Sequence, residues 1–172
     1  MDNMTTALEA QSIILDQYIN RAEKQLVQFS CASEVRELLK NQEDAEATNK
    51  AQAYTDSCHE VMSDWEGLWI ANWDTVQLTH ITPSAIGVPF RTDPDALQAW
   101  RDSMLNSADG LVNQGVFVSP STGKMLLNMR MIVYDTDGTT PIGAVGGGPF
   151  VSGLGDILRE LKISGLEHAN YT

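Results

Sequence analysis

The chain has 172 residues, 42% of them hydrophobic, and its 11 basic and 23 acidic side chains give a formal net charge of −12. This length and composition are typical of one folded domain with a sizeable core. We expect no nucleic-acid partner, because a protein that follows a phosphate backbone needs clustered Lys and Arg, and this sequence has no basic run. No stretch approaches the roughly 20 consecutive apolar residues of a membrane span.

The first third of the chain is predicted to be helical. A helix is expected over residues 5–30, which contain no Gly or Pro and carry apolar residues at spacings of three, four or seven. This stripe consists of Leu8, Leu15, Tyr18, Ala22, Leu26 and Phe29. It can pack on the chain's own core or pair with a second copy in a homodimer, and both can hold along different parts of the helix. A short helix over 33–40 and a third over 44–64 follow.

The remaining residues alternate between strand and helix patterns. A hairpin is predicted over 67–81 with its turn at Asp74 and Thr75, followed by a loop rich in Pro and Gly. A helix over 95–107, a strand over 110–119 and two strands joined at "DTDG" come next, and an amphipathic helix over 154–163 closes the pattern. The sum is an α+β domain whose five-stranded antiparallel sheet is interrupted once by a helical crossover.

An arginine in an apolar strand gives the first functional indication. If the last two strands pair about "DTDG", then Asn128, Arg130 and Ile132 share one face with Gly148, Gly146 and Ala144, while the methionines at 129 and 131 face the other way. Glycines leave space beside the cation, which the protein fills with another element or with a ligand. A buried guanidinium also needs an anion, such as a small carboxylate, unless it pairs internally or lies in solvent.

Other motifs do not indicate chemistry. "DTDG" lacks the later ligands of a calcium loop, and "GAVGGG" lacks the Lys and Ser or Thr of a phosphate-binding loop. The three histidines show no metal-ligand spacing, and Cys31 and Cys58 are expected to be free thiols, although a disulfide between them stays an alternative. We therefore predict no metal, no cofactor and no enzyme, with a small hydrolase kept as a lesser alternative.

Several of these pieces together resemble a Cache domain, the PAS-like sensor module of bacterial transmembrane receptors. The resemblance covers residues 65–161, through the hairpin that ends in Thr79 and His80 before Pro83 and Gly87, then "SPSTGK", "YDTDG" and "IGAVGG" in order. It implies a PAS-like sheet with a long N-terminal helix, residues 1–64 leading into a sensor module at 65–172. Amino-acid-binding members carry an Asp where this chain has Gly148, so recognition of a free amino group is not implied.

The resemblance implies small-molecule sensing outside the membrane, coupled to a chemotaxis region, a histidine kinase or a diguanylate cyclase. We therefore expect this chain to be part of a larger membrane-anchored receptor, rather than a complete small protein. A structural or dimerisation module with a vestigial pocket is the main alternative. The predicted ligand-binding residues are Trp73, His80, Trp100, Phe117, Asn128 and Arg130. Among them Arg130 is the expected carboxylate partner, and the aromatic residues are the expected walls.

Overall fold

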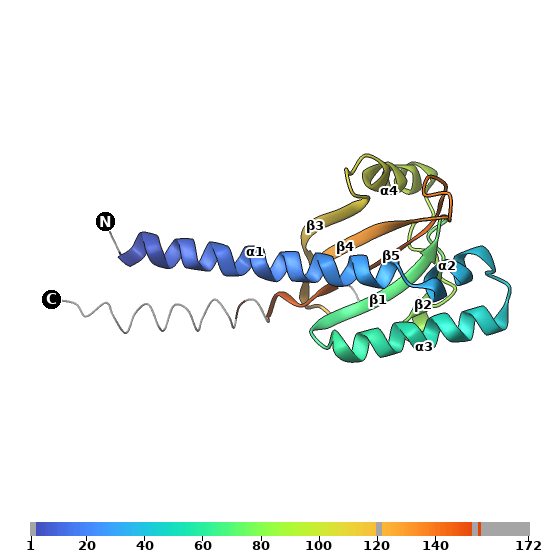
Figure 1. Ribbon diagram of the computed structural model, residues 1–172, viewed down its shortest axis with the longest axis horizontal. Coiled ribbons are helices and arrows are strands. Elements are labelled where there is room, and N and C mark those ends of the chain that lie inside the picture. The colour runs from blue at the N-terminus through green and yellow to red at the C-terminus, as the bar shows by residue number, and fades with distance from the viewer. Residues whose placement is uncertain (1–2, 120–121, 153–154, 156–172) are drawn as a thin grey trace.

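In the computed structural model, which describes residues 3–119, 122–152 and 155, three helices precede the sheet and a fourth interrupts it (Figure 1). The helices are α1 (Asn3–Ser30), α2 (Ser33–Lys40), α3 (Ala45–Val61) and α4 (Pro94–Leu105), with a short 3-10 turn at Pro83–Ala85. The strands are β1 (Trp65–Asn72), β2 (Gln77–His80), β3 (Leu111–Val118), β4 (Met125–Tyr134) and β5 (Pro141–Pro149). The predicted closing helix over 154–163 lies outside the described residues, apart from position 155.

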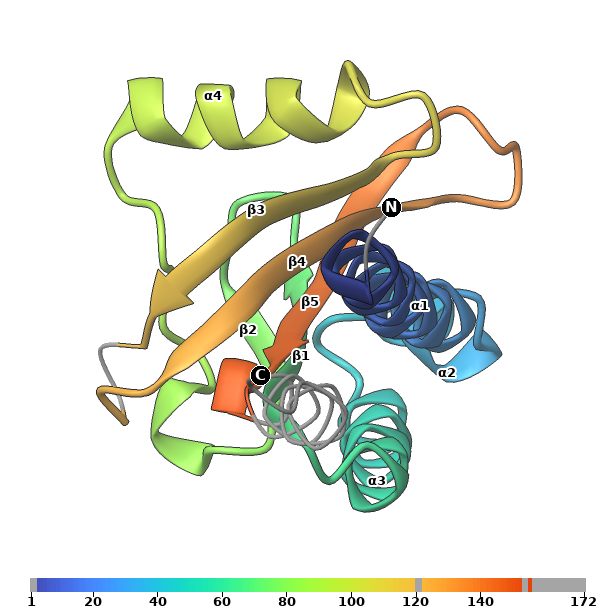
Figure 2. The same ribbon diagram turned by 90° about the vertical axis from the view of Figure 1, so that its left-hand side faces the viewer.

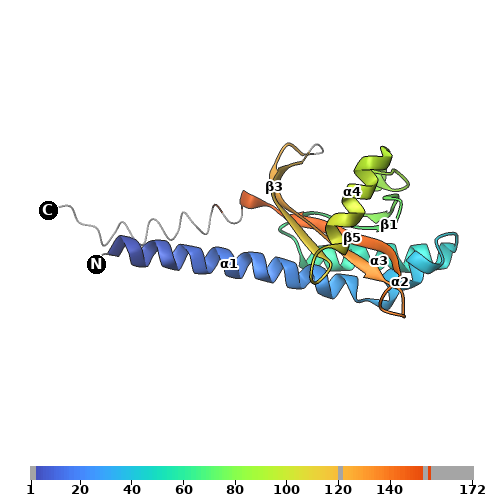
Figure 3. The same cartoon turned by 90° about the horizontal axis from the view of Figure 1, so that it is seen from above.

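The strands form one antiparallel sheet in the order β2-β1-β5-β4-β3. The segment that contains α4 carries the chain from β2 at one edge to β3 at the other. Helices α1, α2 and α3 lie on one face of the sheet and α4 lies on the opposite side (Figures 2 and 3). The predicted α+β class, the five antiparallel strands and the helical crossover are confirmed. No helix in the described part of the chain has both the length and the apolar character to cross a membrane.

The long helix α1 has two different halves. Ala22, Leu26 and Phe29 are buried and pack in the main core with Met129 of β4, as the predicted methionine face requires. In the first half, Leu8 is 61% exposed, and this part of the helix extends beyond the end of the sheet (Figure 1). Core packing therefore accounts for the apolar stripe only in the second half of the helix.

Helix boundaries follow from caps. The Asp44 carboxylate accepts from the backbone N–H of Glu46 at the start of α3, and Asp93 accepts from Ala96 N before α4. Helix α3 ends at Val61, three residues before the predicted end, because the next residues already turn toward β1 and place Trp65 in the core.

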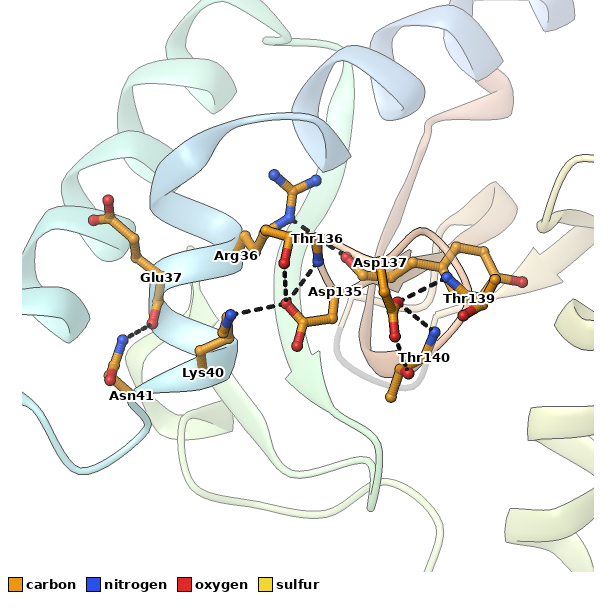
Figure 4. Close-up of polar contacts among 10 residues, drawn as sticks. Arg36, Glu37, Lys40, Asn41, Asp135, Thr136, Asp137, Thr139 and Thr140 are labelled. Carbon is orange, nitrogen blue, oxygen red and sulfur yellow. Dashed lines mark hydrogen bonds and ion pairs between the residues drawn. The ribbon is translucent and has the colours of Figure 1, made fainter.

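The turn between β4 and β5 uses its own carboxylates. Asp137 accepts from the backbone N–H groups of Thr139 and Thr140, both at 2.8 Å, and from the Thr140 hydroxyl (Figure 4). These bonds lower the pKa of the Asp137 carboxyl to about 2. Asp135 forms an ion pair with Lys40 of α2 at 2.9 Å, which ties the hairpin to the helical layer (Figure 4). "DTDG" therefore acts as a turn.

The glycines of β5 are required by close backbone approach. A Cβ atom at Gly148 would lie 1.6 Å from the carbonyl oxygen of Leu127, and one at Gly147 would lie 1.9 Å from that of Gly67. Gly147 also has a φ of 149°, which L-residues rarely adopt. At Gly147 and Gly148 the two neighbouring strands thus pack against β5 without room for a side chain.

This crowding predicts a large difference between two glycine substitutions. We expect Gly148→Ala to lower the free energy of unfolding by about 1–3 kcal/mol or more, because the displaced contact is backbone and cannot swing away. Gly67→Ala is the control, since its Cβ would meet the His80 ring at an ordinary 3.8 Å. Urea denaturation measures both, and equal stability of the two variants would contradict the packing described here.

Candidate functional site

A cavity of about 470 Å³ lies on the α4 side of the sheet. All five strands, the loop between β2 and α4, and α4 itself contribute to its lining. This volume is typical of sites that hold small metabolites. The lining residues are Glu66, Gly67, Trp69, Gln77, His80, Thr82, Phe90, Arg91, Trp100, Gln114, Phe117, Ser119, Thr122, Leu126, Asn128, Arg130, Gly147 and Gly148. Five of the six predicted site residues are among them, and Trp73 is not.

Arg130 lies in this lining with only 5% of its surface exposed. Its Nη2 donates to the Ser103 hydroxyl at 2.8 Å, and its guanidinium lies 6.0 Å from the centre of the Trp100 ring. Its Nε is buried without a hydrogen-bond partner. Within the described residues no carboxylate pairs with it. Neither the internal ion pair nor the solvent exposure considered from the sequence is present.

The environment of Arg130 is electrostatically costly for a cation. Burial lowers the pKa of the guanidinium to about 10, and the positive charge of Arg91, which also lines the cavity, adds to this decrease. At neutral pH the side chain still carries its charge. The cavity thus places two cations near each other and supplies one buried N–H that lacks an acceptor, an arrangement that an anionic group would neutralise.

The space beside Arg130 is partly filled by a neighbouring element of the protein. Arg130 pairs with Gly146, as the register predicted, but Gly146 in turn pairs with Trp69 of β1. A Cβ at Gly146 would lie 2.2 Å from the Trp69 ring. The volume that this glycine leaves is therefore occupied by the protein's own indole, and the cavity lies beside that ring. Of the two alternatives that the sequence left open, another element fills the space directly over Gly146, and the sequence did not identify Trp69 because it paired β5 with β4 alone.

Aromatic rings form the wall near α4. Trp100 is 4% exposed and contacts Phe90 with ring centres 5.5 Å apart, and Phe90 lies 5.2 Å from Trp69. Trp73 packs behind this wall, 5.8 Å from Trp100, where the Arg101 guanidinium covers it at 5.6 Å. Trp73 follows the last residue of β1, so it leaves the sheet before it can reach the cavity. The placement of Trp73 in the lining is thus corrected.

His80 is held by the loop that follows it. Its Nδ1 accepts the backbone N–H of Thr82 at 2.8 Å, so the neutral ring carries its proton on Nε2, which lies beside Gly67 in the cavity lining. Burial lowers the pKa of the imidazole, and the nearby negative charge of Glu66 partly opposes this effect. The ring therefore both positions the loop and offers an N–H donor to the cavity.

The remaining predicted residues lie on the two strands farthest from β2. The Asn128 amide donates to Gln114 Oε1 at 2.8 Å, and both side chains line the cavity. Phe117 also lines the cavity but is 46% exposed. Gln114 was not predicted, because it belongs to an irregularity in β3 where the register shifts between Asn113 and Val116.

Glu66 is the functional candidate that sequence reasoning missed most clearly. Trp65 pairs with Pro149 and Gly67 pairs with Gly148, so Glu66 is an extra residue in a β-bulge. The sequence signal was available: the core residues Trp65 and Leu68 are three apart, which a regular strand of period two cannot place on one face. The bulge turns Glu66 into the cavity lining.

The architecture is that of known sensor domains. No protein-family model matches this sequence, and no curated protein matches it. Among solved structures, the chain is similar to the sensor domain of the V. cholerae histidine kinase DctB, with a TM-score of 0.70, 12% identity, and coverage of 88% of this chain and 56% of that one. It is also similar to the E. coli DcuS sensor domain, with a TM-score of 0.58, 20% identity, and coverage of 82% and 94%.

A third similar structure contains a ligand. It is the ligand-binding domain of the Pseudomonas aeruginosa PAO1 amino-acid chemoreceptor PctC in complex with GABA, with a TM-score of 0.55, 21% identity, and coverage of 95% of this chain and 64% of that one. This chain spans little more than half of the DctB domain, and almost all of the DcuS domain. The chain therefore has the fold of Cache-type sensor domains, as the sequence resemblance implies.

The His80 environment predicts a pH dependence of stability. Between its lowered pKa and its ordinary value of 6.5, the folded chain binds fewer protons at His80 than the unfolded chain does. The contribution of His80 is therefore complete above about pH 6.5 and is lost as the pH falls through the folded-state value. We expect the melting temperature of the unmodified chain to fall more steeply from pH 7 to pH 5 than that of His80→Asn. A steeper fall in the variant would contradict this assignment.

Proposed function

We propose that this chain is the extracytoplasmic, small-molecule-sensing domain of a bacterial membrane receptor. The receptor would be a chemotaxis receptor, a histidine kinase or a diguanylate cyclase, and the domain itself would catalyse no reaction. The proposal is supported by the fold, which the chain shares with sensor domains of receptors of these kinds, and by the cavity on the α4 side of the sheet. Ligand binding would shift the populations of two receptor states.

The ligand is proposed to carry a carboxylate. The observation that carries this proposal is Arg130, a buried cation with an unpaired Nε in the wall of a cavity. A carboxylate placed there would accept from Nε and from the other N–H groups of the guanidinium. The Nε2–H of His80, beside Gly67, offers a donor to another part of the ligand. Asn128, Trp100 and Phe117 are proposed as further contacts.

The two alternative functions, a vestigial module and a hydrolase, explain the open cavity and the unpaired Nε of Arg130 less well. A vestigial module would be expected to fill its pocket, and Trp69 does so over Gly146, yet a volume of about 470 Å³ stays open beside it. A hydrolase would need a nucleophile next to a base. Within the described residues, the acceptor nitrogen of the His80 ring is used by the backbone N–H of Thr82, so this histidine cannot serve as the base for a cavity hydroxyl.

Arg130→Met is expected to separate ligand binding from stability. A screen of organic acids by thermal shift identifies a responding acid, which at 100 times its dissociation constant adds about 2.7 kcal/mol, or about 5–10 °C, to the unmodified chain. The variant should lose this shift. Its unliganded stability should be unchanged or higher, because an incompletely paired buried cation is replaced by an apolar side chain of similar length.

Arg101→Met is the matched control for that experiment. Arg101 is an α4 arginine outside the cavity lining that pairs with Asp74 at 2.6 Å, so the acid should still stabilise this variant. A full thermal shift in Arg130→Met would remove Arg130 from the site. If no organic acid stabilises the unmodified chain, the proposed function itself fails.

The exposed half of α1 is proposed as a homodimer contact. Leu8 and Met4 are 61% and 76% exposed on a helix that extends beyond the sheet (Figure 1). Two copies that align these apolar residues would bury them, as paired helices do.

Two charge-matched variants test this contact. Leu8→Glu should weaken self-association by about tenfold or more in analytical ultracentrifugation, because two buried carboxylates would face each other. Gln17→Glu adds the same charge on the opposite side of the helix and should leave association unchanged. A chain that is monomeric at high concentration, or equal effects of the two substitutions, would overturn the proposed dimer.

A further inference from the structure

The carboxylate of Glu66 faces the same cavity as Arg130 but belongs to its opposite end. Arg130 of β4 pairs with Gly146 of β5, which in turn pairs with Trp69 of β1, so the three residues lie in one row across the sheet. Glu66 precedes Trp69 by three residues on β1. Three residues of strand correspond to about 10 Å along the sheet. The cavity therefore has a cationic end and an anionic end, separated by a distance on the scale of a small linear metabolite.

Glu66 is placed there by a specific feature of the backbone. In a regular strand Trp65 and Leu68 would face opposite sides of the sheet, because they are three residues apart, yet both lie in the core. The bulge accommodates Glu66 as an extra residue and directs it to the cavity side, and it depends on β5 presenting Gly147 and Gly148 at this level. Bulges commonly re-aim side chains in this way next to binding sites.

The Glu66 carboxylate is oriented but keeps unused acceptor capacity. Its Oε1 accepts from the Ser119 hydroxyl and its Oε2 from the Thr122 hydroxyl. A carboxylate offers about four acceptor positions, so each oxygen retains one. In the described part of the chain no cation pairs with it, and the nearby Lys124 ammonium lies over the Phe150 ring at 5.1 Å instead.

From these observations we infer that Glu66 forms a second subsite, which binds the cationic group of the ligand. Resting on the proposed function, this inference narrows the ligand to a molecule with a carboxylate at one end and an amine or ammonium at the other. It predicts that such bipolar molecules bind better than either end alone, because each charged group then meets an opposite, partly desolvated charge. A dicarboxylate would instead place its second anion against Glu66.

The test uses two series of probes that differ only in the terminal ammonium. Straight-chain alkanoates of three to six carbons are compared with the ω-amino acids of the same length by isothermal titration calorimetry. We expect the best ω-amino acid to bind about tenfold more tightly than its alkanoate. Glu66→Gln should abolish that preference, and its alkanoate affinity should be equal or higher because a negative charge is removed from the cavity, which also shows that the variant is folded. Glu60→Gln, an exposed α3 carboxylate, should keep the preference.

The possible failures are distinguishable. Equal affinity of the unmodified chain for both series, or a preference that survives in Glu66→Gln, would overturn the cation subsite and leave the carboxylate sensor in place. Tighter binding of α,ω-dicarboxylates than of ω-amino acids would overturn it as well. If neither series nor any acid of the thermal-shift screen binds, the subsite and the proposed function both fail.

Discussion

The burial of one guanidinium determines how the α4 side of this sheet is built. Arg130 is almost fully covered, its Nε has no partner, and Ser103 satisfies only part of its donors. A buried cation with so few partners is costly, and an apolar side chain would serve a purely structural role at lower cost. The Trp100 ring, 6.0 Å from the guanidinium, offsets only part of that cost, because a cation–π contact contributes about 0.5–2 kcal/mol. An anionic ligand of the kind proposed above would supply the missing acceptor.

The glycines of β5 connect Arg130 with the rest of the cavity. Gly146 lets the Trp69 ring cross the strand beside Arg130, whereas Gly147 and Gly148 allow the backbones of β1 and β4 to approach closely enough for the bulge at Glu66. A single run of small residues thus sets both the floor of the cavity and the position of its two opposite charges. Gly147 and Gly148 contact backbone carbonyl groups, which have less freedom to move than the ends of side chains.

The sequence was sufficient for the parts that depend on local patterns. Periodicity and turn residues predicted the four α-helices and five strands of the described residues, although not the 3-10 turn at Pro83–Ala85, and the "DTDG" turn placed Arg130 opposite Gly146 correctly. The sequence was insufficient where a strand distant in the chain joins the hairpin. The pairing of β1 with β5 places Trp69 beside Gly146, and no rule for hairpins predicts this pairing. Glu66 was missed because strand alternation places it on the same face as Leu68, whereas the bulge turns it to the cavity side. Trp73 was misplaced because it shares the parity of Trp69 but lies just beyond the strand end.

The central claim is that the Nε–H group of Arg130 donates to an anionic ligand. NMR of this Nε–H group tests the claim most directly. In the unliganded chain the Nε–H proton should lack a strong acceptor, and addition of a bound carboxylate should shift its ¹H and ¹⁵N resonances and slow its exchange with water. The Nε–H of Arg101, outside the cavity, serves as the internal reference. Resonances of Arg130 that stay unchanged while the protein binds a carboxylate would show that the anion lies elsewhere, and would contradict the account.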